Sequence, residues 1–89
     1  MMIHFTLEKC KTRAGYSAKL PSSRKLNLVK IKKEFETILE TPILLVIQEQ
    51  GMEIVVHSYG ELLFKNSKEE DLEKMRKVAE KIYDLGLKN

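Results

Sequence analysis

Apolar and polar residues alternate in the first twenty positions of the chain. In residues 3–9 (IHFTLEK), every second residue from Ile3 to Leu7 is apolar and the residues between are polar. This period of two predicts a half-buried strand. A turn signal near Gly15 precedes a second alternating stretch that ends at Pro21. We therefore expect an antiparallel hairpin at the start of the chain.

The period changes to that of a helix in residues 27–40 (NLVKIKKEFETILE). Asn27 or Ser23 could cap the N-terminus of this segment, and Thr41-Pro42 would end it, because the residue before a proline avoids the α region. The apolar positions fall on one helical stripe: Leu28, Ile31, Phe35, Ile38 and Leu39. The pattern predicts an amphipathic helix over the whole segment.

Three strands in succession are predicted next. Residues 43–49 (ILLVIQE) form a nearly continuous apolar run, which is typical of a central strand. Gln50-Gly51 then predicts a tight turn before a strand over residues 52–58. Tyr59-Gly60 predicts a second turn, with Gly60 suited to a positive φ, before a strand over residues 61–65.

The last segment predicts a helix with defined ends. Ser67 and Glu70 have the spacing of a capping box, and Gly86 stands where a glycine that ends a helix is expected. The apolar stripe that the helix would bury contains Leu72, Met75, Val78, Ala79 and Ile82.

These elements predict a single α+β domain over residues 1–89, in the order β-β-α-β-β-β-α. We expect an antiparallel five-stranded sheet with both helices on one face. That face would carry Ile54, Val56, Leu62 and Phe64. The other face would remain open, and its apolar side chains would be exposed in a monomer. The predicted open face comprises Leu44, Val46, Val55, His57, Leu63 and Lys65.

The second half of the chain, from about residue 43 to residue 87, resembles one repeat of the TATA-binding protein. The resemblance rests on the strand before the turn, the turn Ser58-Tyr59-Gly60, and the junction Lys65-Asn66-Ser67-Lys68-Glu69-Glu70 before the last helix. It implies a concave open face that contacts the minor groove of DNA. Val55 and Leu63 match apolar positions of that face, whereas His57 stands where the family has a wedging phenylalanine. The family places two repeats in one chain, so a dimer would be needed to form the same saddle.

Composition limits the class of protein and the cellular location that we expect for this domain. The chain has 89 residues, of which 43% are hydrophobic, enough for one core. One cysteine excludes an internal disulfide, and no apolar run has the length of a membrane span. The first residues lack the apolar stretch and cleavage site of a signal peptide, so we expect none. We therefore expect a cytoplasmic protein that does not enter a membrane. The high Lys and Glu content is also typical of proteins from hot habitats.

Charge is distributed unevenly along the chain. Residues 1–33 carry a net charge of +8, residues 34–66 carry −5, and residues 67–89 carry zero. The basic third suggests phosphate contacts with nucleic acid, and Tyr16 within it could stack on a base. A solvated lysine-rich surface is the competing interpretation. The candidate nucleic-acid-binding residues are Lys9, Lys11, Arg13, Lys19, Arg24 and Lys25.

Groups capable of catalysis are few. Cys10 with His4 could form an activated thiolate pair, and His57 and Tyr59 are the other candidates. The histidines and the cysteine lack the spacing of a zinc site, and no glycine-rich phosphate loop is present. We expect no enzyme activity, no metal and no cofactor. The sequence favours a non-catalytic module that binds nucleic acid, and the alternative is a self-associating or protein-interaction domain in which acidic and basic thirds meet across a two-fold axis.

Overall fold

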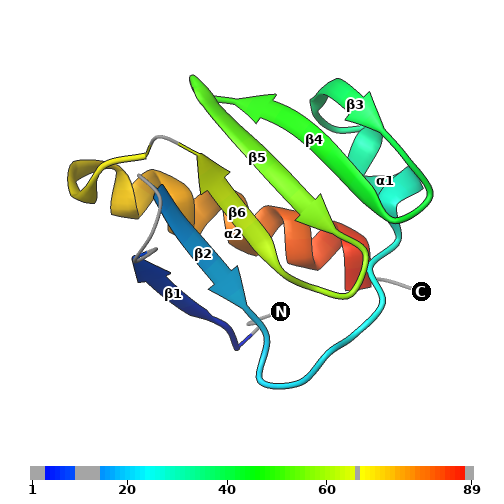
Figure 1. Cartoon of the computed structure of the whole chain (residues 1–89), viewed down its shortest axis with the longest axis horizontal. Helices are drawn as coiled ribbons and strands as arrows, with labels where there is room; N and C mark the ends of the chain where they lie inside the picture. Colours follow the sequence, from blue (N-terminus) through cyan, green and yellow to red (C-terminus); the bar gives the residue numbers. More distant parts are fainter. Residues whose placement is uncertain (1–3, 10–14, 66, 88–89) are drawn as a thin grey trace.

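The fold is an α+β arrangement of one open antiparallel sheet and two helices (Figure 1). The computed structural model describes residues 4–9, 15–65 and 67–87. The sheet has six strands in the order β1-β2-β6-β5-β4-β3. The elements are β1 (Thr6–Lys9), β2 (Gly15–Lys19), α1 (Leu28–Lys32), β3 (Glu36–Glu40), β4 (Leu44–Glu49), β5 (Met52–His57), β6 (Leu62–Lys65), the 3₁₀ turn η1 (Glu69–Asp71) and α2 (Leu72–Leu87).

Both helices cover the same face of the sheet, as predicted. In Figure 1 the strands pass in front of α2 and α1, so the open face is turned toward the reader. The predicted inward positions Ile54, Val56, Leu62 and Phe64 are all fully buried and belong to one core with the helices. The expected hairpin at the start of the chain is present, and β2 joins the sheet by pairing with β6.

The predicted long helix over residues 27–40 and the count of five strands are wrong. Helix α1 ends at Lys32, and the chain then enters a sixth strand, β3, which pairs with β4. Ile38 and Leu39 are each 52% exposed instead of lying on a buried stripe. The reason is backbone pairing. Strand β4 is buried, and without β3 the N–H and C=O groups on one of its edges would lack partners, so residues 36–40 adopt a strand conformation.

The Thr41-Pro42 pair forms the β3–β4 hairpin turn instead of a helix stop. The Thr41 backbone N–H donates to the Leu44 carbonyl at 2.9 Å. The Thr41 hydroxyl oxygen accepts from the backbone N–H of Leu44 at 3.0 Å and of Ile43 at 3.3 Å. Threonine hydroxyls stabilise turns in this way, so the same dipeptide that excludes a continuing helix also closes a hairpin.

The two ends of α2 also differ from the expectation. The structure places the N-cap at Lys68, one residue after the predicted Ser67, and the Asp71 carboxylate accepts from the Lys68 backbone N–H at 3.3 Å. At the other end, Gly86 lies inside the helix rather than after it. There its lack of a side chain allows contact with Leu26 and Ile31 of the α1 region.

Candidate binding surfaces

The open face carries one straight row of side chains that crosses all six strands. Strand register aligns each member of this row with the next, because cross-strand partners project from the same face of a sheet. We call this set the open-face row: Leu39, Val46, Val55, Leu63, Ser17 and Glu8. Its first four members are apolar, so the apolar part lies over β3 to β6.

Val46 and Val55 are less exposed than the sequence suggested. Each is 8% exposed, although neither helix covers this face. Short β-branched side chains in the middle of a sheet are covered by longer neighbours on the same face. Leu44 and Leu63 are half-buried, so the most exposed apolar side chain of the row is Leu39, which the sequence placed on a helix. The segment ETILE shows no regular alternation of apolar and polar residues, so the sequence contained no local signal for this strand.

Charges flank the open-face row, and carboxylates predominate. On the described strands and the β5–β6 turn, the open face carries Glu8, Glu36, Glu53 and Glu61, against Lys19 and Lys65. Lys65 lies 3.1 Å from the Glu53 carboxylate. Phosphate groups are repelled by such an acidic excess, so the charge of this face disfavours nucleic acid.

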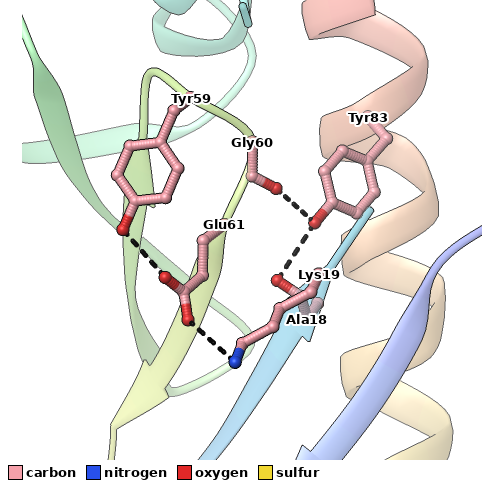
Figure 2. Close-up of polar contacts among 6 residues, drawn as sticks. All are labelled: Ala18, Lys19, Tyr59, Gly60, Glu61 and Tyr83. Atoms are coloured by element: carbon pink, nitrogen blue, oxygen red, sulfur yellow. Dashed lines mark hydrogen bonds and ion pairs between the residues drawn. The ribbon is translucent and has the colours of Figure 1, made fainter. Parts of the chain in front are cut away.

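A polar cluster occupies one end of the open face, at the turn between β5 and β6 (Figure 2). The Tyr59 hydroxyl donates to the Glu61 carboxylate at 2.8 Å, and the same carboxylate lies 4.0 Å from the Lys19 ammonium group. The hydrogen bond to Glu61 raises the pKa of Tyr59, and burial and the negative charge of Glu61 add to the effect. The His57 and Tyr59 rings stack with 5.1 Å between centroids. These contacts fix the position of both rings.

Tyr83 of α2 connects this turn to β2. Its buried hydroxyl lies 2.7 Å from the Gly60 carbonyl and 3.2 Å from the Ala18 carbonyl. Figure 2 draws both contacts. One hydroxyl proton serves both acceptors, and the shorter distance makes Gly60 the principal one. Burial raises the pKa of the Tyr83 hydroxyl far above its ordinary value, and the nearby Glu61 charge acts in the same direction. The hydroxyl therefore stays protonated and donates.

We expect this raised pKa to make the folded protein lose stability in alkali. Above pH 10, unfolded chains release the Tyr83 proton while folded chains retain it, so the free energy of unfolding falls by at most about 1.4 kcal/mol per pH unit. The stabilisation is complete below pH 10. Urea unfolding at pH 8, 10 and 11, compared between wild type and Tyr83→Phe, measures it. The difference between the two proteins should shrink as pH rises, and a constant difference would contradict the assignment.

The structure divides the predicted nucleic-acid-binding residues between two ends of the sheet. Lys9 lies at the end of β1, while Lys19 lies at the opposite end of the hairpin. Arg24 and Lys25 follow in the segment between β2 and α1 and are exposed. Lys11 and Arg13 lie outside the described residues. The six candidates therefore do not form one patch.

A groove with a volume of about 790 Å³ lies beside Arg24 and Lys25. The segment 24–30, the β3–β4 turn and the end of α2 form its walls. Backbone hydrogen bonds hold the first wall: the Leu26 N–H donates to the Ser58 carbonyl at 2.8 Å, and the Asn27 N–H donates to the Gly86 carbonyl at 2.8 Å. The volume falls in the range of ligand sites. Its described lining contains no aromatic ring, so it offers no surface for base stacking.

The remaining sequence candidates are placed apart. Tyr16 is 7% exposed and belongs to the core, so the prediction that it stacks on a base is wrong. Cys10 lies outside the described residues, and His4 is exposed before β1. Within residues 4–9, 15–65 and 67–87, no three His, Cys, Asp or Glu side chains are grouped to hold a metal ion. No helix in that part is long and apolar enough to cross a membrane.

The chain matches no protein-family model, no curated protein and no solved structure in the three comparisons made.

Proposed function

We propose that this protein is a non-catalytic module that binds nucleic acid through the phosphate backbone. The contact surface is the basic segment, defined here as residues 19–33. It carries six cations and no carboxylate: Lys19, Arg24, Lys25, Lys30, Lys32 and Lys33. This uninterrupted positive charge is the observation that carries the proposal, because phosphate contacts require clustered cations and no particular spacing.

The side chains at the groove supply the centre of this surface. Within the described part of the chain, neither Arg24 nor Lys25 forms an ion pair, so both are available to phosphates. Lys32 differs, because its ammonium group lies 3.0 Å from the Glu40 carboxylate. Arg24 and Lys25 are therefore the residues expected to contribute most to binding.

Apart from Lys19 at its end, the open face is left out of this contact. Its carboxylates repel phosphate, and the lining of the groove lacks aromatic rings that could stack on bases. We therefore propose binding without specificity for the base sequence. We also propose that the chain shares its architecture with one repeat of the TATA-binding protein. The succession of β4, β5, β6 and α2, with both helices on one face, supports this likeness. The half-buried His57, stacked on Tyr59, replaces the wedging phenylalanine and argues against DNA kinking by this chain.

We expect the double variant Arg24→Glu/Lys25→Glu to bind a labelled DNA duplex at least about tenfold more weakly than wild type. Losing two phosphate contacts should also make the slope of log affinity against log salt shallower by nearly two. Fluorescence anisotropy over a series of salt concentrations, with duplex and single-stranded oligonucleotides, measures both quantities.

The matched control is Lys74→Glu/Lys77→Glu, which makes the same change in net charge on the exposed side of α2. It should reduce affinity far less than the groove variant. Equal losses in the two variants would show that net charge, not the basic segment, governs binding. No binding of the wild type at low salt would refute the proposed function.

A further inference from the structure

We propose that the open face binds a second copy of this chain, about a two-fold axis that runs across the strands along the open-face row. The inference does not depend on nucleic-acid binding, because the open face has an excess of carboxylates whereas the proposed nucleic-acid surface is the basic segment. It starts from the strand register, which fixes which side chains share the row.

The apolar part of the row favours a two-fold axis that runs along the row, perpendicular to the strands. A two-fold rotation about the row lays each strand over its own copy in the reverse direction. Leu39, Val46, Val55 and Leu63 then each face themselves, so apolar side chains meet apolar side chains across the interface. Two sheets packed face to face interdigitate their side chains in this manner.

The charges beside the row agree with the same axis. Reversing a strand about Leu63 places Lys65 over Glu61 of the second copy, since each lies two positions from Leu63 on the same face. Reversing β5 about Val55 likewise places Glu53 over His57 of the second copy. Symmetry repeats both pairings, so the oppositely charged Lys65 and Glu61 meet twice across the interface. Glu8 faces its own copy at the β1 edge, where solvent screens the repulsion.

A two-fold axis along the strands fits less well. If it lay between β5 and β6, it would place Leu39 over Glu8 of the second copy and Val46 over Ser17. If it lay along β5, it would bring the two Glu53 carboxylates together. The first alternative covers apolar side chains with polar ones, and the second opposes like charges.

The size of the face sets the expected affinity. Six strands about 4.8 Å apart, each about five residues long, give a face of roughly 24 by 17 Å. That is small for a protein interface. We therefore expect a dissociation constant in the roughly micromolar range.

Sedimentation equilibrium of the protein alone, over a wide range of concentrations, tests the pairing through charge-reversal variants. Lys65→Glu and Glu61→Lys should each weaken the dimer at least about tenfold, and the double variant should restore it. Leu39→Lys should weaken it as strongly, because two lysines then face each other. The control Lys74→Glu, on the exposed side of α2, should leave the dissociation constant unchanged.

Three results would overturn the proposal. One is a monomeric wild type at all concentrations. Another is a dimer that none of the charge reversals weakens. The third is a dimer whose response to substitution indicates an axis along the strands. Such a dimer would be strengthened by Leu39→Lys. Alternatively, it would be restored by Lys65→Glu/Glu53→Lys and not by Lys65→Glu/Glu61→Lys. Circular dichroism of each variant shows that it is folded, and Leu39, half exposed at the edge of the sheet, can be replaced without disturbing the core.

Discussion

Replacing Gly60 with alanine should destabilise the protein by about 3 kcal/mol. Gly60 has a φ of +113°, in a region that side-chain-bearing residues rarely adopt. A Cβ there would also lie 3.0 Å from Leu20 Cδ1 and 3.2 Å from the Arg24 carbonyl oxygen. Backbone strain of this kind costs about 1–3 kcal/mol, and crowding in a packed site costs about as much again. Urea denaturation followed by circular dichroism measures the loss.

Gly51 provides the matched control for this substitution. It also has a positive φ, of +78°, but a Cβ added there meets nothing within 4 Å. Gly51→Ala should therefore lower the free energy of unfolding only through backbone strain, by about 1 kcal/mol. The difference between the two variants isolates the crowding at Gly60. If both variants lose the same stability, the close passage of the Leu20–Arg24 segment over the β5–β6 turn is not a significant constraint.

The consequence of Gly60→Ala should extend beyond the turn. The Gly60 carbonyl accepts the hydrogen bond from Tyr83, and the Tyr59 carbonyl accepts from the Arg24 N–H at 3.1 Å. A displaced turn therefore also disturbs the segment that carries Arg24 and Lys25. We expect nucleic-acid affinity and stability to fall together in this variant, whereas Arg24→Glu/Lys25→Glu should lower affinity alone.

The central meander could be predicted from the sequence because its signals are local. Alternation in residues 52–58 and 61–65, together with the glycines at both turns, determined which side chains enter the core. Gly60 has a positive φ, as predicted, and Gln50 and Gly51 in the predicted tight turn have positive φ as well. Burial of Ile54 and Phe64 followed from the same period of two.

Strand β3 could not be predicted because its apolar spacing is ambiguous. Leu28, Ile31 and Phe35 continue into Ile38 and Leu39 with the spacing of a helix, and only the first three are largely buried. The choice of a strand depends on pairing with β4, which is a long-range contact invisible to a local pattern. Missing this strand also hid Leu39 from the candidate binding surface.

The basic surface was predicted in composition but not in arrangement. Sequence proximity grouped Lys9 with Lys19, yet antiparallel pairing places Lys19 beside Thr6 at the start of β1, at the opposite end of the strand pair from Lys9. The position of Arg24 and Lys25 beside the groove depends on long-range contacts, because residues between 24 and 87 line it. The acidic excess of the open face likewise depends on strand register, since its carboxylates come from β1, β3, β5 and the residue before β6.

Gly86 shows how one residue type can serve two different roles. Its place near the end of α2 suggested a helix terminator, but helix α2 continues to Leu87 and Gly86 is buried. An added Cβ would lie 2.9 Å from Ile31 Cδ1 and 3.2 Å from Leu26 Cδ2. The glycine therefore permits the close approach of α2 to the α1 region.

We expect Gly86→Leu to destabilise the protein by about 3 kcal/mol, because overpacking of a closed site costs about 1–3 kcal/mol and leucine adds four carbon atoms. Gly86→Ala should lose far less, since the gain of about 1 kcal/mol in helix propensity offsets much of the crowding. Glu80→Leu, at an exposed position of the same helix, should change stability by less than about 0.5 kcal/mol. Urea denaturation of the three variants measures this order. If Gly86→Leu proved as stable as Glu80→Leu, the α1 region would not be packed against α2, and the groove between them would lose its wall.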